Sequence, residues 1–505
     1  MNARGSRQMP LSENPTGGTF SPLEHGLRAE LARFPAGQAQ HDAVALVSDA
    51  AAAFAVRADS ARSARRSLDV QYYMWRGDVT GRLLAQEALR AADRGVSVRL
   101  LLDDVYAPGR ERMLAALDGH PHIQVRLFNG TRWRMFGRLG FPLELAFGGW
   151  HLNRRMHNKA WIADGCLAVV GGRNLGDEYF GLGAAGTVSF RDLDLVIAGR
   201  AAAQAIVVFN RYWASPLARP AAEVAATAES QGGLPALQRA LADAQTLPGA
   251  QALLAPLSRQ PLEHIRQALT PVHTDAVQVV ADPPEKAKRG LGARKRARAA
   301  GGIAAEIADA LRLAQREVLL ISPYFVPGRA GLALLRDLRA RGVRVAVVTN
   351  SLAATDVVAV HGGYAKYRRA LLEAGVELFE LKPRSRDEHA SLLGSRGAAL
   401  HTKAFAVDGV RAFVGSFNLD PRSAALNTEM GAFVQHEAVA RDVAAEHARL
   451  ADAALSWQVV WQDGALHWRD GDADARVMLR QEPFAGWWRR ALAWVVRRLP
   501  LEEQL

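Results

Sequence analysis

The sequence HTKAFAVDGVRAFVGSFNLDPRSAALNTE, residues 401–429, decides the architecture of this chain. It places Lys403 two residues after His401, and Asp408 five residues after that lysine. The same H-x-K-x4-D spacing occurs at 157–164, so the two histidines lie 401 − 157 = 244 residues apart. The chain therefore carries an internal repeat of chemically reactive side chains.

The spacing places the polar side chains at the start of a hairpin. Alternate side chains of a strand point to one face, so His401 and Lys403 are expected to share a face. The apolar run 404–407 continues this strand, 408–409 has the Asp-Gly sequence of a tight turn, and 412–414 is the returning strand.

Each copy supplies the groups that phosphoryl transfer needs. An imidazole can attack phosphorus, and a lysine or an asparagine amide can hold phosphate oxygens, without a metal or cofactor. A single H-x-K occurs by chance in many strands, but two copies with the same following Gly-rich turn and asparagine favour one shared catalytic site. The expected site residues are His157, Lys159, Asp164 and Asn174 in the first copy, and His401, Lys403, Asp408 and Asn418 in the second. The two aspartates are expected to order their turns rather than to touch substrate.

The double motif resembles the phospholipase D superfamily, whose members carry two histidine–lysine–aspartate motifs. The stretches 70–104, 150–165, 350–381 and 419–431 resemble the bacterial C-type cardiolipin synthases. The resemblance covers roughly residues 20–505. It implies two duplicated α/β/α sandwich lobes with pseudo-twofold symmetry and one composite active site between them.

The resemblance also implies a carboxylate partner for each histidine. Related proteins carry a W-R-D element for this purpose, and here phenylalanine replaces the tryptophan at position 190. Asp192 is the expected partner of His157, and Glu429 the analogous partner of His401. A carboxylate on one ring nitrogen fixes the tautomer and leaves the other nitrogen for chemistry.

Further polar residues have two interpretations each. Asp194 competes with Asp192 because both lie on one face of a strand. Asp103 and Asp104 end a predicted strand, where ligands bind in parallel sheets, but capping acids are the commoner alternative. His361 is expected to be structural or to contact substrate.

The scaffold is repeated together with the chemistry. A helix is predicted over 41–66. The strand–helix–strand order predicted in the first half is 67–75, 80–94 and 96–102, and in the second half 317–325, 330–341 and 343–350. This order indicates α/β layers with parallel strands. The predicted divisions are a lead-in at 1–40, a first lobe at 41–213, an interlobe linker or insertion with a basic run at 214–300, a second lobe at 301–455 and a C-terminal segment at 456–505.

Charge and hydropathy favour an anionic partner at a surface. The net charge is +12, which suits phospholipid head groups or nucleic acid. No apolar run is long enough for a membrane-spanning helix or a signal peptide, and the single cysteine excludes an intrachain disulfide. Together with these features, the resemblance to cardiolipin synthases implies peripheral binding to anionic phospholipid, chiefly phosphatidylglycerol, on the cytoplasmic face of a bacterial inner membrane, with nucleic acid disfavoured.

Three segments have the composition of a lipid-binding surface. Aromatic residues alternate with arginines over 130–155, a basic run covers 286–298, and 484–499 has the pattern of an amphipathic helix with tryptophans on one side and Arg489, Arg490, Arg497 and Arg498 on the other. The alternatives are a packed excursion, a flexible linker and a helix docked on the protein itself.

The expected activity is a two-step displacement at phosphorus that forms cardiolipin. The resemblance implies that His157 is the nucleophile and His401 the general acid and base, although the reverse assignment is open. If water replaces the accepting lipid, the enzyme is a hydrolytic phospholipase D. If DNA replaces the donor, it is a metal-independent nuclease of the same superfamily.

Overall fold

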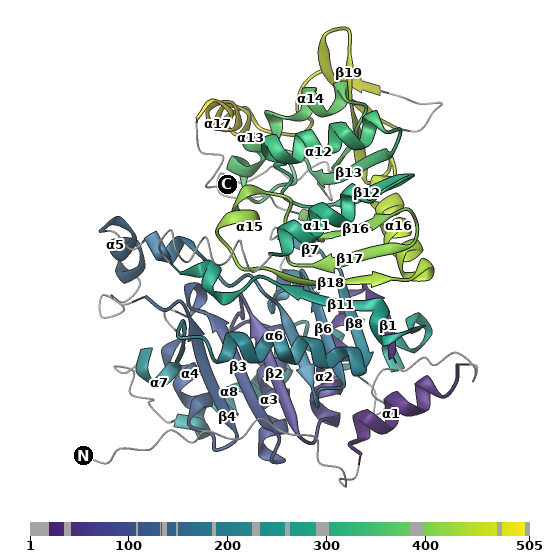
Figure 1. The fold of residues 1–505 in the computed structure, drawn as a ribbon. Coiled ribbons are helices and arrows are strands. Elements are labelled where there is room, and N and C mark those ends of the chain that lie inside the picture. Colours follow the sequence, from purple (N-terminus) through teal and green to yellow (C-terminus); the bar gives the residue numbers. More distant parts are fainter. Residues whose placement is uncertain are drawn as a thin grey trace.

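A computed structural model describes residues 20–34, 42–107, 110–131, 133, 139–147, 150–183, 188–224, 233–257, 263–288, 302–383, 397–471 and 477–499. Figure 1 shows two lobes, one above the other, each built around a large β-sheet. The N-terminal half of the chain forms the lower lobe and the C-terminal half the upper one. The predicted fold class, two duplicated α/β/α lobes, is confirmed.

The first lobe contains a nine-stranded mixed sheet. Its strands are, in order across the sheet, β10 (Thr270–Val272), β1 (Asp42–Val47), β8 (Asp194–Gly199), β6 (Leu167–Gly171), β5 (Ala160–Ala163), β2 (Ser67–Tyr72), β3 (Ser97–Asp103), β4 (Ile123–Phe128) and β9 (Ala218–Pro220). The pairs β2–β3 and β3–β4 are parallel, as predicted, and the other pairs are antiparallel.

The second lobe repeats this sheet. Its strands are, in order, β11 (Val277–Ala281), β18 (Met430–Gln435), β17 (Arg411–Gly415), β16 (Ala404–Val407), β12 (Glu317–Ile321), β13 (Arg344–Asn350), β14 (Glu377–Leu381), β19 (Ser456–Gln462), β20 (Ala465–Asp470) and β21 (Val477–Leu479). From β11 to β19, each strand has its counterpart in the first sheet from β1 to β9. The parallel pairs β12–β13 and β13–β14 match β2–β3 and β3–β4.

Helices cover both faces of each sheet. The first lobe has α1 (Pro22–Leu31), α2 (Ala50–Ser63), α3 (Val79–Asp93), α4 (Glu111–Asp118), α5 (Gly140–Ala146), α6 (Ala203–Trp213), α7 (Ala221–Val224), α8 (Gly233–Asp243) and α9 (Ala250–Leu254). The second has α11 (Ile303–Arg312), α12 (Gly328–Ala340), α13 (Val358–Ala365), α14 (Arg368–Glu373), α15 (Pro421–Ala425), α16 (Glu437–Ala451) and α17 (Trp487–Arg498). A buried apolar cluster contains residues of both sheets together with α6 and α16, so the lobes share one central core.

A two-stranded parallel ribbon also joins the lobes. It pairs β7 (Val188–Arg191) of the first lobe with β15 (Gly397–Leu400) of the second. β7 ends directly before Asp192, and β15 ends directly before His401. The ribbon therefore brings a carboxylate of one lobe to the histidine of the other.

One sequence prediction differs from the structure. The stretch predicted as one helix over 41–66 is the strand β1 followed by α2, because the apolar residues of β1 pair with β8 and β10 and Asp49 then caps the helix through the Ala52 amide. The segment 214–300, predicted as an interlobe linker or insertion, holds α8 and α9 against the first lobe and contributes β11 to the second sheet.

Candidate active site

The two histidines lie at equivalent places in the two sheets. His157 and His401 each sit just ahead of a strand, β5 or β16, that runs antiparallel to the first strand of the parallel set. Their backbone amides donate across the seam, from His157 to the Thr428 carbonyl and from His401 to the Arg191 carbonyl, both at 2.8 Å. Main-chain hydrogen bonds between the two lobes therefore fix the position of both histidines.

The carboxylate partners are crossed between the lobes. His157 Nδ1 lies 2.8 Å from Glu429 Oε2, and His401 Nδ1 lies 2.6 Å from Asp192 Oδ2. The predicted pairing of Asp192 with His157 and of Glu429 with His401 is thus wrong. The prediction assumed that each carboxylate serves the histidine of its own repeat. In the structure, Asp192 and Glu429 directly follow residues whose carbonyls accept the backbone amide of the other lobe's histidine.

Asp194 belongs to a structural ion-pair network rather than to the site. Its Oδ2 lies 2.9 Å from Arg57 Nη2 and 3.0 Å from Arg173 Nε, and all three side chains are buried. Arg173 also donates to the carbonyl of Asp192 at 2.9 Å. The network therefore fixes the backbone that carries the Asp192 carboxylate.

The electrostatics of the site keep both imidazoles neutral. Burial is the main cause that lowers the pKa of His157 to about 4, in spite of Glu429. Burial, followed by the charges of Lys403 and Lys159, lowers the pKa of His401 well below its usual value. A neutral imidazole that donates from Nδ1 to a carboxylate presents the lone pair of Nε2. Both rings are thus prepared to accept a proton or attack an electrophile.

The lysines respond to the same burial. Burial lowers the pKa of Lys159 to about 7 and that of Lys403 to about 8, with Glu429 opposing the shift in both cases. Each lysine donates to the carbonyl of its own motif histidine, at 2.6 Å for Lys159 and 2.5 Å for Lys403. Each lysine also lowers the pKa of the other lobe's histidine, which shows that the four side chains form one electrostatic unit.

The motif asparagines have buried polar atoms available. Among the described residues, the side-chain oxygens of Asn174 and Asn418 are buried without a hydrogen-bond partner, while the Asn174 amide nitrogen donates to the Tyr179 hydroxyl at 2.9 Å. Buried polar atoms without a partner are uncommon unless a ligand or water satisfies them. The predicted asparagines therefore keep hydrogen-bonding capacity that other protein groups do not use.

The motif aspartates lie at the far ends of the hairpins. Asp164 accepts the backbone N–H groups of residues 65–67, and Asp408 those of residues 315–317, at distances of 2.7–3.1 Å. Both adopt positive φ, 49° and 54°, in the Asp-Gly turns after β5 and β16. Their hydrogen bonds are those of turn-ordering residues, as expected from the sequence, although both had been included among the candidate site residues of the motif.

A glycine and a serine occupy equivalent positions and differ in function. A Cβ on Gly172 would lie 2.3 Å from Asp192 Oδ1, so only glycine fits there. Ser416 instead donates to Glu429 Oε2 at 2.5 Å and accepts the Met430 amide at 3.0 Å. The two carboxylates consequently have different surroundings, although the histidines they orient are related by the repeat.

Aromatic rings that sequence reasoning missed wall the site. The ring centroids of Tyr73 and His157 are 5.1 Å apart, and those of Tyr179 and Phe190 lie 5.1 and 5.0 Å from His401. The only sequence signal was Phe190, which was linked to the wrong histidine. Tyr73 and Tyr179 stand outside the repeated motif and carry no signal of their own.

The acidic residues after β3 support the site from beneath. Asp103 accepts the Met156 amide at 2.8 Å and lies 3.2 Å from Arg155 Nη1, so it holds the backbone just before the first histidine. Asp104 accepts the Thr131 amide. His361 contacts Arg368 and lies 3.7 Å from Glu482, within a buried charge network of the second lobe.

The predicted lipid-binding segments are only partly described. Lys286 is buried and pairs with Asp282 at 2.7 Å, so it is not part of a surface run. Arg289 and the four basic residues at 294–298 lie outside the described residues, as do Phe136 and the arginines at 132, 134 and 138. The helix α5 exposes Leu139, Leu143 and Phe147, and Phe147 is 75% exposed.

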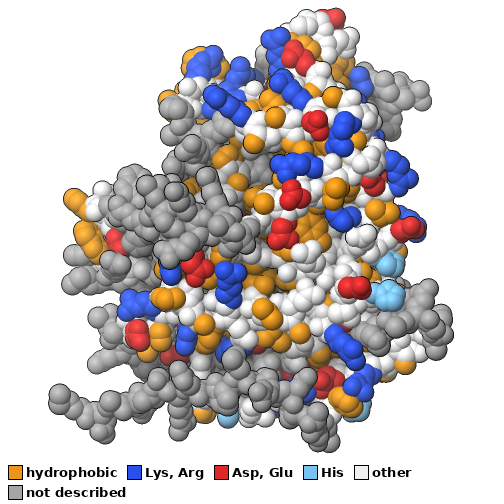
Figure 2. Space-filling model, viewed as in Figure 1, with side chains coloured by type: hydrophobic (Ala, Val, Ile, Leu, Met, Phe, Trp, Pro, Cys, Tyr) orange, Lys and Arg blue, Asp and Glu red, His pale blue; other side chains and the backbone are white. Residues whose placement is uncertain are grey.

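The C-terminal helix α17 combines both interpretations of the tail. It docks on α13 through Ala493, Val496 and the fully buried Arg489, whose guanidinium binds the carbonyls of Leu352 and Thr355. Arg489 thus faces the protein, contrary to the predicted wheel. The opposite side exposes Trp487, Leu492, Trp494 and Val495, with Trp487 80% exposed. Figure 2 shows basic and apolar side chains together over α17 at the upper left.

No helix in the described ranges combines the length and apolar character that a bilayer crossing requires. Within the same ranges, no group of three or more histidine, cysteine or acidic side chains is placed to hold a metal ion.

Two repeated α/β/α lobes that share one histidine–lysine centre define a phospholipase D-like enzyme. The comparison with protein families agrees, since the family described as "Cardiolipin synthase, PLD-like domain" matches residues 59–213 and 307–451. The chain belongs to this family and is a phospholipase D-type phosphatidyltransferase.

Individual relatives support this assignment. The chain is 38% identical to cardiolipin synthase C of Escherichia coli (strain K12), covering 89% of this chain and 93% of that protein. It is 26% identical to a cardiolipin synthase of Geobacillus sp. (strain WCH70), covering 86% and 70%. Among solved structures, phosphatidylserine synthase of Haemophilus influenzae Rd KW20 matches with a TM-score of 0.54 at 14% identity, over 84% of this chain and 91% of that one, and shares the fold.

Proposed function

We propose that this enzyme transfers a phosphatidyl group from phosphatidylglycerol to a second phospholipid and so forms cardiolipin. The observation that carries the proposal is the crossed pair of neutral imidazoles, each oriented at Nδ1 by the other lobe's carboxylate. The relatives named as cardiolipin synthases support the choice of lipid.

The first step forms a phosphohistidine. Nε2 of His157 attacks phosphorus, an N–P bond forms, and the P–O bond to the leaving glycerol breaks as His401 delivers a proton to its oxygen. Glu429 stabilises the charge that develops on His157, and Lys159 and Lys403 hold the phosphoryl oxygens. The bound phosphodiester anion offsets the two lysine charges that lower the pKa of His401 in the empty site, so that this ring can carry the proton.

The second step reverses the roles of acid and base. His401 takes the proton from a hydroxyl of the accepting phosphatidylglycerol, and the resulting oxygen attacks phosphorus and breaks the N–P bond. Two molecules of phosphatidylglycerol thereby give one cardiolipin and one glycerol. Proton transfer of this kind contributes about 10²–10⁴-fold to rate. Asp192 orients His401 for both transfers.

The exposed apolar helices support binding at a bilayer surface. α5 in the first lobe and α17 in the second expose apolar side chains, and Figure 1 shows both helices on the same side of the molecule. Tryptophan, arginine and aliphatic side chains on one exposed helix suit the headgroup region of a membrane. We infer that these helices hold the enzyme peripherally on the cytoplasmic face of the inner membrane, with anionic lipid attracted by the net charge of +12.

The test uses the purified full chain with phosphatidylglycerol vesicles and a separation of the lipid products. Cardiolipin with released glycerol is the expected result. Phosphatidic acid alone would replace the proposal by a hydrolytic phospholipase D, and no lipid product together with nicking of plasmid DNA would replace it by a nuclease. Radioactive phosphatidyl trapped by rapid denaturation in detergent at neutral pH, where the N–P bond survives, should lie on His157, and a His157→Ala variant that still becomes labelled would overturn the assigned nucleophile.

A further inference from the structure

The outer face of the second lobe contains an apolar cavity of about 350 Å³ between α11, α12 and α15. Its walls are almost entirely hydrocarbon, with Arg329 and Asp420 as the charged members. The volume falls within the roughly 300–1,000 Å³ of small-molecule sites. Apolar cavities of this kind bind apolar ligands rather than water.

The cavity lies beside the backbone of a motif residue. Phe417 and Leu419, which line it, are the two neighbours of Asn418 in the chain. Phe325 lines the same cavity and pairs with Leu419 in an isolated parallel bridge. A ligand in the cavity would therefore lie against the backbone that presents a motif asparagine.

The duplicated fold provides an internal control, because the first lobe has equivalent positions. Leu68 pairs with the residue before Asp164, and Val318 with the residue before Asp408. The two helix–strand units are thus offset by 318 − 68 = 250 residues. With this offset Trp75 is equivalent to Phe325, and its bridge to Leu175 is equivalent to the Phe325–Leu419 bridge.

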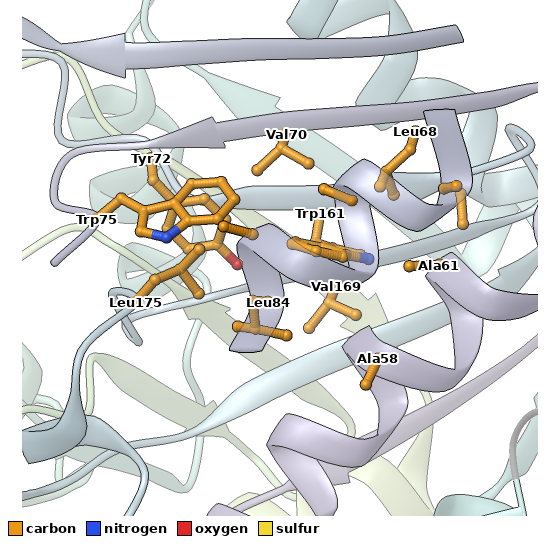
Figure 3. Close-up of a cluster of buried hydrophobic side chains, with 14 of the residues drawn as sticks. Ala58, Ala61, Leu68, Val70, Tyr72, Trp75, Leu84, Trp161, Val169 and Leu175 are labelled. Atoms are coloured by element: carbon orange, nitrogen blue, oxygen red, sulfur yellow. The ribbon is translucent and has the colours of Figure 1, made fainter. Parts of the chain in front are cut away.

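The first lobe fills the equivalent space with its own side chains. Figure 3 shows Trp75 and Trp161 packed among Leu84, Val169 and Leu175, and both tryptophans are buried. The Trp75 indole N–H donates to the Gly81 carbonyl at 2.9 Å.

The helix pair α2–α3 of the first lobe is also covered, by α8 and α9 of the inserted segment. In the described part of the second lobe, Phe325 and Phe405 stand where the first lobe has Trp75 and Trp161. The helices α11 and α12 also have no covering helices equivalent to α8 and α9 in that part. One lobe of the duplicated fold has thus kept an open cavity where the other is packed.

We propose that this cavity binds one acyl chain of the phosphatidyl substrate while its phosphate lies at the histidines. This inference rests on the proposed function, which requires a substrate with two acyl chains. An acyl chain that leaves the bilayer needs apolar surroundings in the protein. The chemistry of the walls, their continuity with Asn418 and the filled counterpart in the other lobe together select a flexible hydrocarbon chain as the occupant.

The first experiment detects the chain directly. Phosphatidylglycerol with a diazirine at the end of one acyl chain is mixed with the full-length enzyme in vesicles, irradiated, and the labelled peptides are identified. We expect label on α11 and α12 in the wild-type enzyme and in a His157→Ala variant, which binds without turnover. Label confined to α5 and α17 would overturn the proposal.

Two variants on one helix test the cavity itself. Ala308→Trp places an indole inside it, and Ala305→Trp places the same side chain on the exposed side of α11. We expect Ala308→Trp to reduce the α11–α12 label at least tenfold and Ala305→Trp to leave it unchanged. Phe325→Trp, which copies the first lobe and can donate to the Gly331 carbonyl as Trp75 donates to that of Gly81, should act like Ala308→Trp.

The second experiment measures chain-length selectivity below the aggregation limit. Each buried methylene is worth about a factor of four, or about 0.8 kcal/mol, so one chain longer by two carbons should raise kcat/KM about 15-fold. We compare dihexanoyl with dioctanoyl phosphatidylglycerol. Ala308→Trp should flatten this ratio, and Ala305→Trp should retain it.

The outcomes separate this inference from the proposed function. Equal ratios in the wild type and in both variants would overturn the cavity proposal even if cardiolipin is made. Label in the cavity without cardiolipin formation would support the cavity while the proposed transferase reaction fails. A loss of label in both variants would mean general destabilisation and would also count against the cavity.

Discussion

The crossed carboxylates predict which variants share a kinetic defect. Glu429→Gln and Asp192→Asn each replace a buried carboxylate by a neutral amide of the same shape, at 2.8 and 2.6 Å from Nδ1 of His157 and His401 respectively. At an effective dielectric constant of 20, two unit charges about 4 Å apart attract by about 4 kcal/mol. Since about 1.4 kcal/mol is a tenfold change in rate, each variant should lose about 10³-fold in turnover with phosphatidylglycerol.

The assay separates the two histidines by the leaving group. A phosphatidyl ester of p-nitrophenol needs no proton on its leaving oxygen, so the first step depends on the nucleophile alone. Variants of the acid–base histidine and its partner should still release a burst of p-nitrophenolate, whereas variants of the nucleophile and its partner should not. We expect Glu429→Gln to behave like His157→Ala, and Asp192→Asn like His401→Ala.

The grouping is the decisive result, and it does not depend on which histidine attacks. If Asp192→Asn shares the defect of His157→Ala while Glu429→Gln shares that of His401→Ala, the crossed arrangement is refuted. Glu437→Gln, an exposed carboxylate at the start of α16, serves as the matched control and should leave both phases unchanged.

Four further outcomes follow from the described contacts. In pH profiles, kcat/KM should fall as pH rises through about 7–8, because Lys159 and Lys403 lose their charge in this range. Lys159→Arg should move this fall in kcat/KM to higher pH, and an unchanged profile would contradict the role of the lysine charge. Gly172→Ala should remove activity because its Cβ would clash with the Asp192 carboxylate. Ser416→Gly should lower kcat only about tenfold, because it loses one hydrogen bond to Glu429. Steady-state kinetics should show the larger loss in Gly172→Ala. Asp164→Ala should lower the free energy of unfolding by about 1–3 kcal/mol, because its hydrogen bonds to backbone amides are lost. The folded variant should keep the p-nitrophenolate burst. Normal stability with a lost burst would instead show that Asp164 acts in the active site. Val495→Ser on α17 should weaken binding to phosphatidylglycerol vesicles in a sedimentation assay. The control Val207→Ser, at a valine of α6 that is more exposed (71% against 44%), should bind as the wild type does.

Sequence reasoning located the reactive residues because the repeat marks them. Chemistry that is duplicated at a constant offset stands out against the background of ordinary strands, so the histidines, lysines and asparagines were all identified. The strand–helix–strand order of both lobes was also readable, since β2, α3 and β3 have clear periodicities and their counterparts β12, α12 and β13 repeat them.

Three features were invisible in the sequence for physical reasons. A pseudo-twofold arrangement permits either pairing of carboxylates and histidines, and only the β7–β15 ribbon selects the crossed one. The short apolar run 42–47 suits a helix or a strand, and its sheet neighbours made the choice. In α17 the burial of Arg489 depends on two carbonyls of the loop that precedes α13, and a helical wheel contains no information about them.

The crossed arrangement has a consequence for biosynthesis. Glu429 follows His157 by 272 residues, and a ribosome adds roughly 5–20 residues per second, so the first lobe emerges roughly 14 to 54 s before its counterion exists. During that interval the nascent N-terminal half holds an imidazole without the anion that orients it. Nascent chains, truncated products and proteolytic halves should therefore be inert towards the host's own lipids, and the reactive centre is switched on only when the last fifth of the polypeptide has been made and folded.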